Sequence, residues 1–354
     1  MSLRRVQVTD FRCLPLAEMD LDPRFTLLSG PNASGKTSLL EAIYVLGRGR
    51  SFRTRRLEHL IRSGALRLMI LGEADVAGRR VTLGVSGSEG RMRARMAGEQ
   101  TASLADLAAV FPVQIIDPEV HHLIEEGPRR RRRFLDWGVF HVEQTFVASW
   151  QKYHQVLKQR NAALRSRQPR AVVAAWDNDL VRYGEAVTAA RQRYVAQLAA
   201  IVGPLGQRLL GKELTLTYRH GWARELSYSE ALRRSWEQDQ ESGSTQVGPQ
   251  RAELVLKLDG FTVTDRISRG QQKLLAAVLL ISQLRLFPTD AAAQPTLLLD
   301  DPAAELDNER LAGLIEEVRA QPVQLVVTTL QAEFPALGSP GRRFRVEAGR
   351  VQAL

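Results

Sequence analysis

The chain has 354 residues, of which 44% are hydrophobic and 25% are charged. These proportions are ordinary for folded globular proteins, and they exclude a largely disordered chain. The length suggests two domains, at roughly 100 to 200 residues per domain. No apolar run approaches the roughly 18 to 20 residues of a membrane span, and the opening MSLRRVQVTDFRCL has no hydrophobic signal core. A cytoplasmic protein without a membrane partner is therefore expected.

Charge and cysteine content narrow the class of partner. The formal net charge is +10, which favours an acidic partner, nucleic acid first. The single cysteine, Cys13, cannot form an internal disulfide and offers no thiolate metal cluster.

Residues 1–118 are predicted to be mainly β structure around one helix. The segments RRVQVTDFRCL and AEMDLDPRFTLLSG are predicted strands, and the second leads through a glycine-rich turn into the apolar helical segment KTSLLEAIYVLG. Further strands are predicted at LRLMILGEADV, RRVTLGVSG and FPVQIID, with GRMRARMAGEQ as a hairpin. A strand, a loop and a helix thus open an α/β domain.

Residues 119–245 are predicted to be a helical insert. Two interpretations stay open for it, a compact helical subdomain and a projecting arm, and the break at RSRQPRA would let two helices fold back on each other. After the linker ESGSTQVGPQ, strands are predicted again at AELVLKLDG and TLLLDD. Residues 246–354 are therefore expected to complete the first domain. Apolar residues spaced three and four apart predict a heptad seam on the second helix, formed by Trp176, Leu180, Tyr183, Val187, Ala190, Tyr194 and Ile201.

The segment GPNASGKT fits the phosphate-binding pattern G-x-x-x-x-G-K-[ST]. Between a strand and a helix, its glycines let backbone N–H groups converge on a phosphate, and the helix dipole favours the negative charge. Lys36 would reach the β and γ phosphates of ATP, and Thr37 would offer its hydroxyl to Mg²⁺. The alternative is a glycine turn with an exposed lysine. The predicted nucleotide contacts are Gly30, Pro31, Asn32, Ala33, Ser34, Gly35, Lys36, Thr37 and Ser38.

The segment TLLLDD supplies carboxylates at the end of a predicted buried strand. Asp300 is expected to hold Mg²⁺ together with Thr37, and Asp301 is expected to act as the general base that orients the attacking water. The catalytic residues predicted are thus Lys36, Asp300 and Asp301. A solvated acidic turn is the alternative.

The segment SRGQQK precedes a long apolar helix and forms a second candidate anion site. ISRGQ lines up with the LSGGQ signature of ABC-type ATPases, which closes over the γ-phosphate bound to the opposite subunit. This order of motifs predicts an α/β ABC-type ATPase head with an inserted helical arm, and an ATP-dependent homodimer. A simple serine N-cap is the alternative. The predicted contacts are Ser268, Arg269, Gly270, Gln271 and Lys273, with Asp307 in a following AELD loop.

Stretches spread over nearly the whole chain resemble the RecF family of bacterial recombination-repair ATPases, which are related to SMC proteins. They include GPNASGKTSLLEAIYVLGRGRSFR, GPRRRRRFLDWGVFH, VGPQRAEL, SRGQQK and LLLDDPAAELD. The resemblance implies that Arg12 approaches the nucleotide phosphates. It also implies gap repair with RecO and RecR, helping RecA load onto DNA. Gln250 departs from the family, which usually has histidine there.

Two arginine clusters are candidate DNA contacts, and either could instead be a solvated charge run or a salt-bridge cluster at a helix start. The DNA could be single-stranded, duplex or a gap junction. They are Arg50, Arg53, Arg55 and Arg56, and Arg129, Arg130, Arg131, Arg132 and Arg133.

An ABC-type ATPase subunit serving a transporter is the alternative function. It would carry a switch histidine where LVVTTL has Thr328 and Thr329, and a glutamine loop for which Gln114 is the sole candidate. Without that histidine, and with the shorter Asp301 as base, slow hydrolysis is expected.

Overall fold

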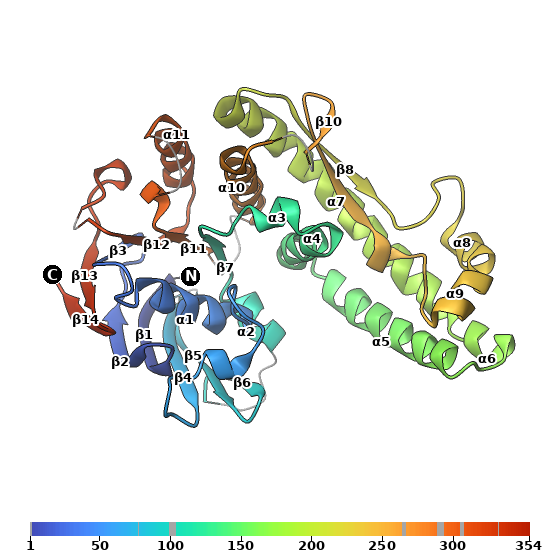
Figure 1. Cartoon of the computed structure of the whole chain (residues 1–354), viewed down its shortest axis with the longest axis horizontal. Helices are drawn as coiled ribbons and strands as arrows, with labels where there is room; N and C mark the ends of the chain where they lie inside the picture. Colours follow the sequence, from blue (N-terminus) through green and yellow to red (C-terminus); the bar gives the residue numbers. More distant parts are fainter. Residues whose placement is uncertain are drawn as a thin grey trace. The chain divides into compact units, whose positions relative to one another are not determined.

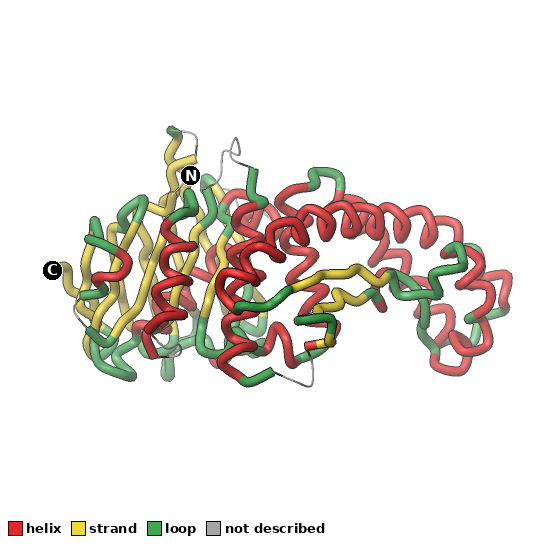
Figure 2. The backbone as a smooth tube through the Cα atoms, turned by 90° about the horizontal axis from the view of Figure 1, so that it is seen from above, coloured by secondary structure: helices red, strands yellow, loops and turns green. Residues whose placement is uncertain are grey.

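The computed structural model describes residues 2–76, 78–98, 104–263, 267–288, 294–304, 308–331 and 333–354. The chain divides into two compact units, here called unit 1 (Met1–Val120 with Phe287–Leu354) and unit 2 (His121–Leu286). Unit 1 contains most of the strands and unit 2 most of the helices (Figure 2). The expected return to the first domain at residue 246 thus lies instead at residue 287.

The phosphate-loop strand lies inside a six-stranded sheet of unit 1, in the order β14-β13-β3-β12-β11-β7 (Figure 1). Five of these strands are parallel, and only β14 runs antiparallel to its neighbour. Parallel strands end at one edge of a sheet, so loops far apart in sequence converge there. The strands are β3 (Phe25–Ser29), β7 (Val113–Ile116), β11 (Thr296–Asp300), β12 (Gln324–Thr329), β13 (Arg342–Glu347) and β14 (Arg350–Ala353).

A second sheet of unit 1 has five antiparallel strands in the order β2-β1-β4-β5-β6. The segment AEMDLDPRFTLLSG, expected as one strand, is divided between β2 and β3. The chain turns between them because the Asp22 carboxylate accepts the N–H groups of Arg24 and Phe25. The strands are β1 (Ser2–Phe11), β2 (Leu14–Asp20), β4 (Leu68–Val76), β5 (Arg79–Ser88) and β6 (Arg91–Met96).

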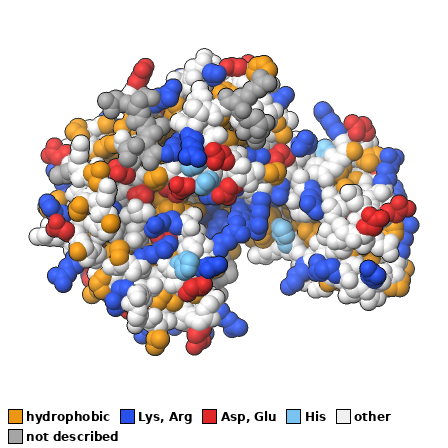
Figure 3. All heavy atoms as spheres, viewed as in Figure 1, with side chains coloured by type: hydrophobic (Ala, Val, Ile, Leu, Met, Phe, Trp, Pro, Cys, Tyr) orange, Lys and Arg blue, Asp and Glu red, His pale blue; other side chains and the backbone are white. Residues whose placement is uncertain are grey.

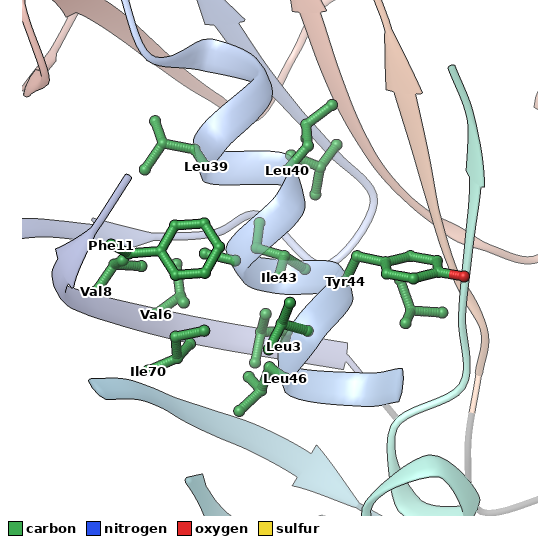
Figure 4. Packing of buried hydrophobic residues seen from close by; sticks show 14 of the residues in the cluster. Leu3, Val6, Val8, Phe11, Leu39, Leu40, Ile43, Tyr44, Leu46 and Ile70 are labelled. Carbon is green, nitrogen blue, oxygen red and sulfur yellow. The ribbon is translucent and has the colours of Figure 1, made fainter. Parts of the chain in front are cut away.

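Helix α1 (Lys36–Arg48) is buried on nearly every side, as expected of a helix inside a core. Figure 4 shows Leu39, Leu40 and Ile43 from this helix among side chains of β1 and β4. At Gly47 a Cβ would lie 2.6 Å from the Phe111 carbonyl oxygen, so only glycine fits there. The other helices of unit 1 are η1 (Leu57–His59), α2 (Leu104–Val110), η4 (Pro302–Ala304), α11 (Asn308–Arg319) and η5 (Pro335–Leu337).

Unit 2 is built on two long helices that pack side by side, α5 (Phe146–Arg165) and α7 (Asp177–Leu210), with α6 (Arg170–Ala174) at the turn between them (Figure 1). Helix α10 (Arg269–Arg285) packs on α7, and β9 pairs with β8, which is why the unit extends to residue 286. Its other elements are α3 (His122–Glu125), α4 (Pro128–Val142), α8 (Tyr228–Arg234), α9 (Trp236–Ser242), η2 (Pro249–Arg251), β8 (Leu214–Arg219), β9 (Glu253–Leu258) and β10 (Phe261–Thr262).

The buried stripe of α7 differs in part from the predicted seam. Tyr183 and Ile201 are only half-buried, and the stripe continues instead through Gly184, Arg191 and Leu198. The apolar pattern could not include Arg191, because this residue is charged. It can be buried because its guanidinium pairs with Asp136 at 2.7 Å. Four seam residues are buried as predicted, namely Leu180, Val187, Ala190 and Tyr194. Within the described residues, no helix has both the length and the hydropathy of a membrane span.

Candidate functional site

The loop between β3 and α1 has a backbone that only glycine permits at both ends. Gly30 has φ 153°, and a Cβ there would lie 2.1 Å from the Val346 carbonyl oxygen. Gly35 has φ 112° and caps α1. The N–H of Gly349 donates to the Ser34 carbonyl at 2.9 Å, so the β13–β14 hairpin fixes the loop from outside. The two glycines of the predicted motif therefore serve the shape of the loop.

The end of this loop is suited to an anion. The first turn of α1 contains no acidic residue, so its N–H groups and dipole favour negative charge. Lys36 Nζ donates to the Gly30 and Pro31 carbonyls at 2.7 and 2.8 Å, which folds the lysine over the loop. Burial lowers the pKa of Lys36, while the nearby carboxylates Asp301 and Asp300 act in the opposite direction. Among the described residues, Ser34 Oγ is buried without a hydrogen-bond partner.

Asp300, at the end of β11, meets the phosphate loop. Thr37 Oγ1 lies 3.1 and 3.0 Å from the two carboxylate oxygens of Asp300, and Thr328 Oγ1 donates to Asp300 Oδ1 at 2.7 Å. Hydroxyl and carboxylate oxygens are the ligands that Mg²⁺ prefers. The two residues predicted to hold the metal are thus in contact, although 263 positions separate them in the sequence.

Asp301 follows directly and turns away from the strand, with φ 45°. Aspartate tolerates this left-handed conformation better than most residues. Its N–H donates to Thr328 Oγ1 at 2.9 Å, so one threonine holds the backbone of Asp301 and the side chain of Asp300. In the sequence, Thr328 was noted only because it stands where a transporter ATPase would have its switch histidine. Its position in a second buried strand could have indicated a contact with the acidic pair.

Arg12 lies at the β1–β2 turn with φ 56°. Its guanidinium donates to both carboxylate oxygens of Glu41, at 2.9 and 2.7 Å, rather than lying free beside the loop. Glu41 also accepts from Ser51 Oγ, and from Arg53 Nη1 at 3.4 Å. Sequence reasoning missed Glu41, because an acidic residue inside a helix usually indicates a solvated position.

The signature segment lies in unit 2, at the start of α10. Ser268 is the N-cap, accepting the Gln271 N–H at 3.3 Å, while the Gln271 side chain accepts the Ser268 N–H at 3.0 Å. This capping box explains Ser268 and Gln271, two of the six residues of SRGQQK, whereas a serine N-cap alone would explain only the first. It does not explain Gly270, where a Cβ would meet nothing nearer than Ser268 Oγ at 4.0 Å. Arg269 is exposed, Lys273 is half-buried, and the expected contact Asp307 lies outside the described residues.

The second arginine cluster lies on α4, where the structure corrects part of the DNA-contact prediction. Arg131 is buried, and its guanidinium is bound to Glu253 at 2.9 and 3.0 Å and to the Ile124 carbonyl at 2.7 Å. Arg132 donates to the Ala252 carbonyl at 2.6 Å, and Arg130 pairs with Glu126 at 2.6 Å. Arg131 is therefore a structural residue, because a buried paired guanidinium does not reach a DNA backbone.

The first arginine cluster remains at the surface of unit 1. Its four side chains, Arg50, Arg53, Arg55 and Arg56, are exposed, and in unit 2 Arg129 is exposed and Arg133 half-buried. Lysine and arginine side chains are abundant on the face that Figure 3 displays. Gln114, by contrast, is buried within β7, so it does not form a glutamine loop.

Gln250 is a packing residue of unit 2. It accepts a hydrogen bond from the Tyr153 hydroxyl and donates to the Val247 and Thr245 carbonyls at 2.9 and 3.2 Å. Burial raises the pKa of Tyr153, which keeps the phenol protonated as a donor. The glutamine thus fixes the loop before β9 through three polar contacts.

Comparisons with known proteins agree over the whole chain. The family model described as RecF/RecN/SMC N terminal domain matches residues 2–343. The DNA replication and repair protein RecF of Pseudomonas fluorescens is 40% identical over 362 residues, covering 99% of this chain and 98% of that protein. The protein of the same name from Yersinia pseudotuberculosis is 37% identical over 356 residues, covering 99% of both.

A solved structure described as the recombination mediator protein RecF-ATPrS in the RecFOR pathway matches with a TM-score of 0.84 at 25% identity. The match covers 99% of this chain and 98% of that one. The α/β fold with its mixed sheet is that of the RecF and SMC ATPase heads. The chain belongs to the RecF/RecN/SMC family and, within it, to the RecF proteins.

Proposed function

We propose that this chain is a DNA-binding ATPase of RecF type that acts in recombinational and replication-gap repair. The observation that carries the proposal is the contact of Thr37 with Asp300, which joins the phosphate loop to the carboxylate at the end of β11. Relatives named DNA replication and repair protein RecF, at 37 and 40% identity over nearly full length, support the biological process.

Hydrolysis follows from the placement of the site residues. Lys36 Nζ exchanges its two carbonyl contacts for oxygens of the β and γ phosphates, which the N–H groups of α1 also bind. Thr37 and Asp300 would hold Mg²⁺, which neutralises charge developing on the phosphates. Asp301 orients the attacking water and accepts its proton. Thr328 sits on β12 where a switch histidine would stand, so one catalytic partner is lacking and the rate is slow.

The signature segment supports an ATP-dependent homodimer. The first turn of α10 has no acidic residue, and Gly270 leaves open space above it. In the dimer, Ser268 and Gly270 of one protomer face the γ-phosphate held by Lys36 of its partner. ADP lacks that phosphate and leaves the anion site at α10 empty.

The dimer acts as a clamp on DNA and cooperates with mediators of the RecO and RecR type to load RecA. The four exposed arginines of residues 50–56 and Arg129 are the proposed contacts to DNA phosphates. Binding through them weakens steeply with salt, because each neutralised phosphate releases counterions. An ATPase subunit of a transporter is the disfavoured alternative. Such a subunit would carry a switch histidine and a glutamine loop, whereas this chain has Thr328 and Thr329 at the first position and a buried Gln114 within β7.

ATP hydrolysis with and without DNA, combined with sedimentation in ATP, ADP and a nonhydrolysable analogue, tests the function. We expect slow hydrolysis that DNA stimulates, and dimers with ATP or the analogue but not with ADP. Hydrolysis unaffected by any DNA form, together with no DNA binding at low salt, would contradict the proposal and favour the transporter alternative.

A further inference from the structure

Two histidines and two glutamates lie together on the short helix α3 of unit 2. His121 is the N-cap residue of this helix, His122 is its first residue, and Glu125 and Glu126 follow one turn later. Glu125 Oε2 lies 3.8 Å from His121 Nε2 and 3.9 Å from His122 Nδ1. Glu126 Oε1 lies 3.7 Å from the same His122 nitrogen. Side chains three and four positions apart share one face of a helix, so the spacing of these residues brings them together.

The separations of these atoms suit ligands of one cation better than direct hydrogen bonds. A hydrogen bond from nitrogen to oxygen spans about 2.7 to 3.2 Å, which is shorter than the contacts of Glu125 with either histidine. A tetrahedral zinc ion holds each nitrogen or oxygen at about 2.0 to 2.2 Å, so two of its ligands lie roughly 3.3 to 3.6 Å apart. The rings of His121 and His122 lie side by side, with centroids 4.4 Å apart, and offer nitrogens within 4.8 Å of each other. Small side-chain rotations would therefore place all three ligands around one ion.

The backbone that carries these side chains is held in place from inside unit 2. Leu123 and Ile124, between the histidines and the glutamates, are buried. The Ile124 carbonyl accepts a hydrogen bond from Arg131 at 2.7 Å, and the guanidinium of Arg131 is itself bound to Glu253 at 2.9 and 3.0 Å. A fixed backbone favours metal binding, because the ligands are already near their positions before the ion arrives.

The donor atoms select the class of cation. Imidazole and carboxylate ligands together favour transition metals such as Zn²⁺, whereas Mg²⁺ and Ca²⁺ prefer oxygen ligands throughout. The His121 side chain is 9% exposed, and those of His122 and Glu125 are 31% and 35% exposed, so an ion can enter from solvent and retain water on its open side. Glu126 is less suited as a ligand, because its other oxygen pairs with Arg130 at 2.6 Å.

We propose that His121, His122 and Glu125 form a binding site for a transition-metal cation of the zinc type, which holds the four-residue helix α3 in its conformation. A helix this short has little stability of its own, and the ligands come from its N-cap and its last residue, so the ion would connect both ends. The site shares no residue with the phosphate loop or the acidic pair. The proposal is therefore independent of the proposed function.

The first test is calorimetric titration of the untagged chain with Zn²⁺, without nucleotide and with Mg²⁺ in large excess to occupy the oxygen ligands of Asp300. We expect one strongly bound ion per chain. Affinity should fall by about 10-fold or more in His122→Ala and in Glu125→Gln, because loss of even an indirect partner of a metal ligand commonly costs about 10- to 100-fold. His59→Ala, which removes an exposed histidine of unit 1, and Cys13→Ser should bind Zn²⁺ like the parent.

Two results of this titration would overturn the proposal. One is parental affinity in both His122→Ala and Glu125→Gln. The other is a loss of binding that is confined to Cys13→Ser or is equally large in His59→Ala, because the ion would then be held elsewhere. Both altered ligands reach solvent, so these variants should fold, and circular dichroism checks that they do.

The second test measures the effect of the ion on α3. Amide hydrogen exchange of residues 121–131 is followed by mass spectrometry with and without Zn²⁺. At a Zn²⁺ concentration 100 times its dissociation constant, opening that releases the ion is suppressed by up to about 100-fold, so exchange of α3 should slow by about 10-fold or more in the parent. It should not change in His122→Ala. Zinc that binds the parent without slowing exchange here would refute the role of the ion in holding α3.

Discussion

Asp300 and Asp301 are adjacent in the sequence, and the proposed function gives them separate tasks. Asp300 completes a strand, where hydroxyls of Thr37 and Thr328 fix its carboxylate. Asp301 has a positive φ, so the backbone leaves the extended conformation of the strand at this residue. Two neighbouring carboxylates can then serve a metal and a water without sharing one position.

Substitution separates these tasks. Lys36→Ala should abolish tight ATP binding, because the loop loses its cation. Asp301→Asn should retain ATP binding and slow hydrolysis by about 10²- to 10⁴-fold, the usual contribution of a general base. Binding is measured with a fluorescent ATP analogue and hydrolysis by phosphate release. Parental hydrolysis in Asp301→Asn would show that another group orients the water.

Thr328→Val removes the hydroxyl that binds Asp300 while keeping the volume of the side chain. Hydrogen bonds to charged groups contribute about 1.5 to 3 kcal/mol, so the turnover rate should fall by roughly 10- to 100-fold and more Mg²⁺ should be needed for half-maximal rate. Thr329→Val is the matched control, because the Thr329 hydroxyl accepts the Gln331 N–H, whereas the Thr328 hydroxyl donates to Asp300. A Mg²⁺ titration that is the same for both variants would argue against the role of Thr328.

The sequence indicated which motif residues come together at the ends of β3 and β11 better than it indicated the residues that hold them in place. The phosphate loop and the acidic pair have fixed spacings, so Lys36, Thr37 and Asp300 could be named in advance. Glu41 and Thr328 could not, because each acts through partners from other segments. That partnership depends on how the strands pair, which residue spacing alone does not reveal.

At the scale of elements, α5 and α7 are joined by a buried ion-pair network. Arg160 is fully buried and binds Asp239 at 2.7 Å, Asp177 at 2.8 Å and Thr245 at 2.8 Å. Burial raises the pKa of Asp239, and the bonds from Gln246 and Arg160 oppose this rise. The network connects α5 to the start of α7 and to α9.

Arg160→Leu should destabilise unit 2 by about 3 to 5 kcal/mol, because Asp239 is left buried without its cation. Arg193→Ala breaks the pair with Glu143, where 57% of the arginine side chain is exposed, and should cost far less stability, because solvent screens an exposed ion pair. Urea unfolding followed by circular dichroism measures both. Similar losses in the two variants would mean that the network does not hold these helices together.

The boundaries of elements were harder to predict than their type. Helix α10 was recognisable from its apolar run, but which unit it joins depends on its packing against α7. The β texture of AELVLKLDG indicated a strand without indicating its sheet, and β9 pairs with β8 in a separate three-stranded sheet. The structure therefore places the domain boundary at residue 287, whereas the sequence predicted it at residue 246.

At the scale of the whole molecule, the proposed dimer has two identical composite sites related by a two-fold axis. Ser268→Arg should leave nucleotide binding by the monomer nearly intact, since the phosphate loop is unchanged, and should block the interface by bulk and charge. Because this variant should no longer dimerise, its rate of ATP hydrolysis should fall as well. Sedimentation and phosphate release are the measurements.

Mixing Ser268→Arg with Lys36→Ala tests completion between subunits. One site of the mixed dimer then combines both defects, and the other site is normal. Partial recovery of ATPase activity in the mixture supports completion in trans. Failure to recover, with Ser268→Arg still forming dimers in ATP, would leave Ser268 as a helix cap only.

The position of β3 has a consequence for synthesis of the chain on the ribosome. Both sheet neighbours of this strand, β12 and β13, come much later in the sequence, between Gln324 and Glu347. The ribosome therefore completes the phosphate loop roughly 15 to 60 s before the strands that flank it, at about 5 to 20 residues per second. Until then β3 is an unpaired apolar strand. The sheet that holds the phosphate loop can therefore form only after the chain has been synthesised as far as Glu347.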